Sequence, residues 1–194
     1  MKVGEWAKAA NLCSQAAQRW SGAIGNRSNA LVPGRKAAPR KAFTMDMTWV
    51  TGRIAVGGGI WTAEHMSEIA RAGITHIIDM QIEFDDTALA KPHGIAVLWN
   101  PIDDDFKPVS VDVLRRGVDF ALHALDEEGT KLYVHCAAGV HRAPLMTLAI
   151  LCSLSWKLED ALHLIETRRP VVDFPDVYVN SVQRFLQQSV KAGP

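Results

Sequence analysis

Hydrophobic residues recur between positions 49 and 190 in two alternating patterns, short continuous runs and longer helical stripes. The short runs are rich in β-branched residues and predict strands at 49–58, 74–80, 95–102 and 130–136. The stripes, with apolar residues three and four apart, predict helices at 62–73, 110–129, 143–155, 157–170 and 176–190. This alternation predicts a single α/β domain with a central, mostly parallel sheet flanked by helices.

The first 43 residues lack this pattern. They are rich in Ala, Gly, Ser and Asn and carry eight basic residues against Glu5, whereas the whole chain has a net charge of zero. We therefore predict a basic, flexible N-terminal tail over 1–43 and the folded domain over 44–194. A short helix at 6–20, an organelle transit peptide, and true initiation at Met45 or Met47 remain open alternatives.

Composition excludes several classes of protein. Of 194 residues, 48% are apolar and 22% charged, which is typical of a soluble globular protein. Three unpaired cysteines favour a reducing, cytoplasmic compartment.

The longest uncharged run, 143–156, is too short to span a bilayer, so we expect no membrane association. The basic tail lacks the aromatic interleaving of a nucleic-acid surface, and we expect no nucleic-acid partner. The oligomeric state stays open.

No metal or cofactor is expected either. The seven histidines show no metal-ligand spacing. Gly57, Gly58 and Gly59 lack the spacing of a nucleotide-binding loop and predict a tight turn before a helix.

The stretch VHCAAGVHRAP, residues 134–144, carries the strongest chemical signal. It joins a predicted strand to a predicted helix, with Pro144 in the first turn of that helix. The small residues of this stretch let backbone amides turn inward and form an anion nest, which the helix dipole reinforces. Such a nest favours both a phosphate and a cysteine thiolate. Arg142 adds a planar fork that holds two phosphate oxygens.

His-Cys-x5-Arg between a strand and a helix resembles the signature loop of the protein tyrosine phosphatase superfamily. The order of motifs from about residue 49 to 186 resembles its dual-specificity branch. These motifs are GITHIIDM, NPIDDDF, VHCAAGVHRA and LHLIETRRP.

This resemblance implies hydrolysis of phosphomonoesters, in phosphorylated proteins or small molecules, through a phosphocysteine intermediate. Cys136 would be the nucleophile, and His135 would orient the loop and favour the thiolate. Arg142 and the backbone amides of the loop would bind the phosphoryl group. The loop residues are Ala137, Ala138, Gly139, Val140, His141 and Arg142.

The resemblance also implies an aspartate as general acid about thirty residues upstream. The motif aligns best on Asp104, with Asp103 and Asp105 as alternatives. An acidic turn that only precedes the helix starting near Ser110 is the other interpretation. Lysines are absent from the loop, which favours phosphotyrosine or another simple phosphomonoester over highly anionic lipid headgroups.

One position departs from the family. Ala143 stands where the family has Ser or Thr, which implies slower breakdown of the phosphoenzyme or another donor to the departing thiolate. A phosphate-binding pseudophosphatase is therefore one alternative, and a rhodanese-like sulfurtransferase is another. Cys152 is expected in the core, or as a redox partner that protects Cys136.

Overall fold

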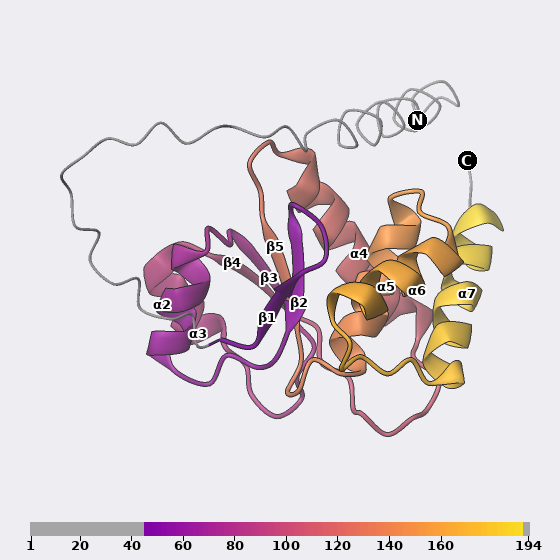
Figure 1. Ribbon diagram of the computed structural model, residues 1–194, viewed down its shortest axis with the longest axis horizontal. Coiled ribbons are helices and arrows are strands. Elements are labelled where there is room, and N and C mark those ends of the chain that lie inside the picture. The colour runs from indigo at the N-terminus through magenta and orange to yellow at the C-terminus, as the bar shows by residue number, and fades with distance from the viewer. Residues whose placement is uncertain (1–44, 192–194) are drawn as a thin grey trace. The chain divides into compact units, whose positions relative to one another are not determined.

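The computed structural model describes residues 45–191. The predictions for residues 1–43, including the helix at 6–20, lie outside the described residues. Five strands form one sheet in the order β1-β2-β5-β3-β4 (Figure 1). The strands are β1 (Met47–Trp49), β2 (Ile54–Gly57), β3 (His76–Asp79), β4 (Ala96–Trp99) and β5 (Leu132–His135). β2, β5, β3 and β4 run parallel, and only β1 is antiparallel, which confirms the predicted fold class.

The first predicted strand, 49–58, is wrong in detail. It is split into β1 and β2, which pair as a hairpin with Met47 opposite Gly57. The Val50 amide donates to the carbonyl of Ile54 at 2.9 Å and closes the turn. Two short strands in a hairpin can have the same β-branched composition as one continuous strand. The apolar pattern of the sequence therefore does not distinguish the two arrangements.

The helices follow the predicted stripes closely. They are α2 (Ala63–Arg71), α4 (Val111–Asp126), α5 (Arg142–Ser153), α6 (Leu158–Arg168) and α7 (Asp176–Lys191). Thr62 and Ser110 accept hydrogen bonds from the first turns of α2 and α4, as N-capping residues do. Two short elements were not predicted, α3 (Thr87–Ala90) and the 3-10 helix η1 (Lys91–His93). Each spans about one turn, which is too short to show a period.

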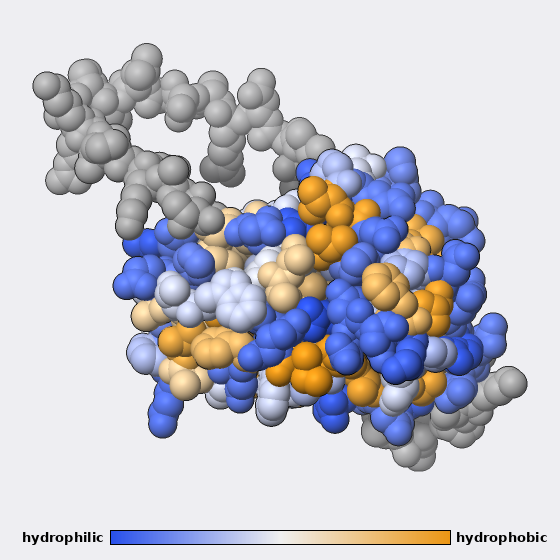
Figure 2. Space-filling model, turned by 90° about the horizontal axis from the view of Figure 1, so that it is seen from below, coloured by the Kyte–Doolittle hydropathy of each residue, from blue (hydrophilic) through white to orange (hydrophobic). Residues whose placement is uncertain are grey.

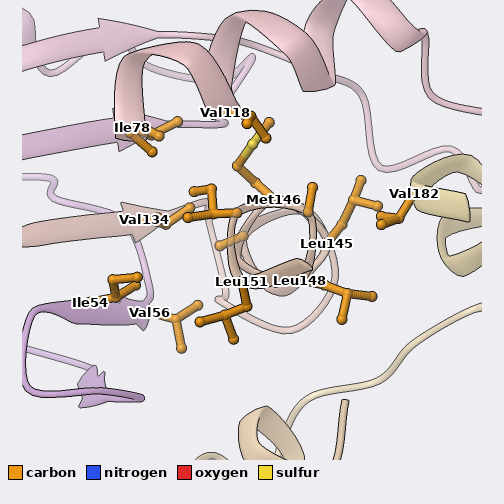
Figure 3. Close-up of a cluster of buried hydrophobic side chains, with 14 of the residues drawn as sticks. Ile54, Val56, Ile78, Val118, Val134, Leu145, Met146, Leu148, Leu151 and Val182 are labelled. Atoms are coloured by element: carbon orange, nitrogen blue, oxygen red, sulfur yellow. The ribbon is translucent and has the colours of Figure 1, made fainter. Parts of the chain in front are cut away.

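The helices cover both faces of the sheet (Figure 1). On one face, α4 to α7 bury the larger core, into which alternate strand residues such as Ile54, Val56 and Val134 point (Figure 3). On the other face, Ala55 and Tyr133 pack beneath α2 and α3. β5 therefore lies in the middle of the sheet and is buried on both faces. β4 is an edge strand and is only partly buried, although its run of apolar residues is of the kind that predicts a strand buried on both faces.

The parallel strands end at one edge of the sheet, and the loops that follow them lie together there. These loops are at the lower edge of Figure 1, and Figure 2 views the molecule from that side. Between residues 45 and 191, no helix has the length and hydropathy needed to cross a bilayer.

Candidate active site

Cys136 directly follows the central strand β5 and opens the loop that ends at α5. Its side chain is buried, and the Gly139 amide donates a hydrogen bond to Sγ at 3.2 Å. The helix α5 begins at Arg142, so its N-terminus faces the same loop. The Gly139 N–H therefore points at the sulfur, and the positive end of the α5 dipole lies at the same loop, which are two features of an anion nest.

Gly139 is the turning point of the loop. Its φ of +65° lies in the left-handed region, and a Cβ there would collide with the backbone of Gly57. Only glycine combines this conformation with such a close approach. The predicted role of small residues in shaping the loop is thus supported most directly at position 139.

Arg169 supports the loop from behind. Its Nε donates to the carbonyl of Gly139 at 2.9 Å and its Nη2 to the carbonyl of Ala138 at 3.2 Å. Asp46 accepts two hydrogen bonds from the same guanidinium, at 2.6 and 2.7 Å. Because these carbonyls are bonded to Arg169, the loop amides are free to face the other way. Hydrogen bonding to Arg169 also lowers the pKa of Asp46.

Glu83 holds the guanidinium of Arg142. Its two carboxylate oxygens accept from Nη1 and Nη2 at 2.9 and 2.8 Å, and the carbonyl of Ile102 accepts a third bond at 3.2 Å. Burial disfavours the charge of Arg142, but the bonds to Glu83 and the proximity of Cys136 outweigh it and raise the Arg142 pKa. The Arg142 hydrogen bonds lower the pKa of Glu83 in turn. The buried Nε of Arg142 keeps a free hydrogen for an anion.

The three acidic residues after β4 are in different environments. Asp103 is exposed and accepts from the backbone amide of Asp104. Asp105 is exposed and forms an ion pair with Lys107 at 2.7 Å, whose hydrogen bond lowers the Asp105 pKa. Asp104 alone of the three lies against the phosphate loop, with Oδ2 3.8 Å from Nε of Arg142.

Asp104 has two further partners. His141 Nδ1 lies 3.0 Å from Oδ2, and the hydroxyl of Tyr178 donates to Oδ1 at 3.1 Å. Burial, followed by the bond to Asp104, raises the pKa of Tyr178 to about 12, so this hydroxyl keeps its proton. Position 104 is therefore the one of the three best placed to exchange a proton with an anion in the loop.

His135 lies below the loop, fully buried between two carboxylates. Its Nδ1 is 3.8 Å from Asp79 and its Nε2 is 3.0 Å from Asp86. Burial, countered by His135 and assisted by Asp86, raises the pKa of Asp79 to about 7. Asp79, Asp86 and His135 each offer one possible metal-ligand atom, and these three atoms lie within 4.8 Å of one another. Within residues 45–191, they are the group that could share a metal ion. However, the two imidazole nitrogens face different carboxylates, which fits ion pairing on both sides of the ring better than joint coordination.

Ala143 is buried in the first turn of α5 and offers no hydroxyl. Among the described residues, the hydrogen bond that reaches Sγ of Cys136 comes from the Gly139 amide. Cys152 lies near the other end of α5, where burial raises its pKa to about 11. A redox pairing of Cys152 with Cys136 has no support in this arrangement, because the helix separates them.

Residues 60–188 match the family described as dual specificity phosphatase, catalytic domain. This chain belongs to that family. The chain is 30% identical to mouse laforin over 141 residues, which is 60% of this chain and 41% of laforin. It is 28% identical to rat dual specificity protein phosphatase 5 over 116 residues, 59% of this chain and 29% of that protein. The matched part of this chain thus spans less than half the length of these two relatives.

Solved structures agree on the fold. PTPMT1 superimposes with a TM-score of 0.65 at 20% identity, covering 75% of this chain and 98% of that chain. Human DUSP28 also gives a TM-score of 0.65 at 20% identity, with 76% and 96% covered. The predicted family and fold are both confirmed.

Sequence reasoning did not identify several residues of this site. Glu83, Tyr178 and Asp86 reach it from other loops and helices, and no local pattern marks them. Arg169 has a weak signal, because it directly follows α6 and lies four residues after buried Ile165 in the apolar pattern of the sequence.

Proposed function

We propose that this phosphatase hydrolyses phosphomonoesters through a phosphocysteine intermediate. The observation that carries the proposal is the convergence of three groups on one loop. Sγ of Cys136 accepts a hydrogen bond from the Gly139 amide. Glu83 accepts hydrogen bonds from the guanidinium of Arg142, and Asp104 lies beside that guanidinium. A nucleophile, an anion clamp and a proton donor are the parts that phosphoryl transfer requires.

In the first step, Sγ of Cys136 attacks phosphorus, and an S–P bond forms as the P–O bond to the leaving group breaks. Asp104 gives its proton to the departing oxygen. The amides of residues 137–142 and the guanidinium of Arg142 bind the three remaining oxygens and stabilise their charge in the transition state.

In the second step, water attacks phosphorus and the S–P bond breaks. Asp104, now ionised, accepts a proton from that water, and the thiolate and phosphate are regenerated. The Gly139 amide is the donor available to the departing sulfur, because Ala143 has no hydroxyl. We therefore propose that this second step limits turnover.

The substrate class is proposed from the rim of the site. Trp61 and Phe84 form an exposed aromatic pair with ring centroids 6.0 Å apart, and exposed Ile82 precedes Glu83. Figure 2 shows hydrophobic patches on this side between polar side chains. An apolar or aromatic group beside the phosphate fits this rim, which favours phosphotyrosine or a similar monoester. A solved structure of PTPMT1 contains PI(5)P, so a phosphoinositide is the competing substrate.

A phosphate-binding pseudophosphatase is the second candidate, favoured by Ala143 alone. Hydrolysis of p-nitrophenyl phosphate in the presence of EDTA separates the two. We expect turnover in the wild type, none in Cys136→Ser, and a smaller loss in Asp104→Asn, since p-nitrophenolate leaves readily. Binding of vanadate without any turnover in the wild type would overturn the enzymatic proposal. Turnover that EDTA abolishes would overturn the metal-independent mechanism.

A further inference from the structure

We propose that the side chain of His141 positions the general acid from within the phosphate-binding loop. The proposal rests on the proposed function, in which Asp104 protonates the leaving group. His141 belongs to the loop whose amides would bind the phosphate, yet its ring turns away toward the acid and lies 3.0 Å from Asp104 Oδ2. Phosphate binding and acid placement thus depend on one residue.

Three elements surround Asp104 and define its position. His141 contacts Oδ2 from the phosphate loop, and Tyr178 donates to Oδ1 from α7. Arg142 Nε lies 3.8 Å from Oδ2. A hydroxyl both donates and accepts, so Tyr178 can bond either the ionised or the protonated Oδ1. His141 contacts the other oxygen, so each carboxylate oxygen of Asp104 has its own partner.

His141 is itself fixed by a second carboxylate. Its Nε2 lies 3.5 Å from Asp173 Oδ2, and the Asp173 amide donates to the carbonyl of Val140 at 3.1 Å. The charged or titratable groups that face His141 are therefore Asp104 and Asp173. With Asp173 on Nε2, the ring presents Nδ1 to Asp104, and the acceptor at Oδ2 requires that Nδ1 carry its hydrogen.

The backbone next to Asp104 is also held by His141 and Tyr178. Phe106 has a φ of +56°, a backbone conformation that residues other than glycine rarely adopt. It is maintained only where contacts with neighbouring residues stabilise it. Its ring stacks on Tyr178 at 6.0 Å and meets the edge of His141 at 5.1 Å. The same two residues that contact Asp104 therefore also hold the residue two positions after it.

Two substitutions at position 141 separate the two contacts of the ring. The amide nitrogen of Asn lies near the place of Nδ1, so His141→Asn keeps a donor for Asp104. The longer Gln places its amide near Nε2, so His141→Gln keeps the contact with Asp173 and loses the one with Asp104. Exposed His163 on α6 supplies matched controls, His163→Asn and His163→Gln.

The measurement is kcat/KM for phenyl phosphate and for 2,4-dinitrophenyl phosphate. This parameter reports formation of the phosphoenzyme even where its breakdown limits turnover. Phenolate needs a proton to leave, whereas dinitrophenolate does not. The ratio of kcat/KM for phenyl phosphate to kcat/KM for 2,4-dinitrophenyl phosphate therefore measures the contribution of the general acid. We expect His141→Gln to lower this ratio by about tenfold to hundredfold, which is less than the roughly 10²–10⁴-fold that a general acid contributes as a whole, because Asp104 is still present. His141→Asn restores most of it, and the His163 controls leave it unchanged.

A double substitution tests the route of the effect. In Asp104→Asn the ratio is already low, and we expect adding His141→Gln to lower it no further. An equal loss on both substrates in a His141→Gln protein with wild-type thermal stability would overturn the inference, as would equal ratios for the Asn and Gln variants. His141→Ala, which also lacks the donor, replaces Gln if that variant does not fold. Failure of the proposed function has a different signature, namely no wild-type turnover of either substrate.

Discussion

Arg169 and Gly139 are joined by a hydrogen bond of 2.9 Å between Nε and the carbonyl oxygen, across 30 residues of sequence. This bond and the one to Ala138 orient the peptide groups at the centre of the phosphate loop. The shape of the binding site is therefore set partly by a side chain at the end of α6 that would not itself touch the substrate.

We expect Arg169→Lys to weaken phosphate binding. The guanidinium of Arg169 donates from three nitrogens to two carbonyls and to both oxygens of Asp46, whereas an ammonium group has three donor hydrogens on a single nitrogen. The loss of a bond from a charged donor costs about 1.5–3 kcal/mol. The inhibition constant for vanadate should rise by about tenfold or more. Arg168→Lys, at the exposed neighbouring position, is the control. Unchanged vanadate binding in Arg169→Lys would show that the loop holds its shape alone.

Glu83→Gln should lower kcat/KM for aryl phosphates. The amide keeps one acceptor for Arg142 but removes the charge and one of the two parallel bonds, so the guanidinium is held less firmly. We expect a loss of about tenfold, with a smaller effect for Glu166→Gln on the exposed face of α6. Equal kinetics in the wild type and Glu83→Gln would show that Arg142 needs no support from this residue.

Ala143→Ser should speed breakdown of the phosphoenzyme. A hydroxyl at this position, next to Arg142 at the start of α5, can donate to the departing sulfur. In rapid-mixing experiments we expect a burst of nitrophenolate in the wild type that shrinks in Ala143→Ser, while kcat rises severalfold. Ala149→Ser, also buried in α5, controls for a new buried hydroxyl. The absence of a burst in the wild type would contradict a slow second step.

The pH dependence of stability should report Asp79. Its pKa rises from 3.8 to about 7 on folding, chiefly because the side chain is buried. The folded protein therefore binds this proton more tightly, and the contribution of Asp79 to the free energy of unfolding falls as pH rises from 3.8 to about 7.

Urea unfolding of the wild type and Asp79→Asn between pH 4.5 and 7.5 measures this contribution. Asn does not titrate, so the wild type should lose stability relative to the variant as pH rises, by at most about 1.4 kcal/mol per pH unit. The substitution Asp85→Asn, at an exposed position, should not alter the slope. Parallel curves for the wild type and Asp79→Asn would show that Asp79 is ionised across this range.

Local patterns in the sequence predicted most elements of the fold. The period of apolar residues located α4, α5 and α7 to within a few residues, because each has several turns with a buried stripe. Hairpin β1–β2 and the short α3 were not predicted correctly. Both are too short for a period, and their form depends on pairing and packing with distant segments.

The candidate site was predicted in the same uneven way. Cys136, Gly139 and Arg142 are contiguous on one loop, so their spacing alone indicated an anion site. Which of three neighbouring aspartates reaches that site was left open, because a loop can present any of them. Contacts of Asp104 with His141 and Tyr178, 37 and 74 residues away, distinguish it from its neighbours.

The sequence by itself determined the class of fold and located the loop of Cys136 and Arg142 on which the proposed chemistry depends, because these follow from local periodicity and a short motif. Only the tertiary structure decided which residues support that loop. Glu83 meets it because the parallel strands β3 and β5 end at one edge of the sheet and bring their following loops together there. Arg169 and Tyr178 meet it from the end of α6 and from α7. Such contacts leave no local pattern, since each joins positions that are remote along the chain.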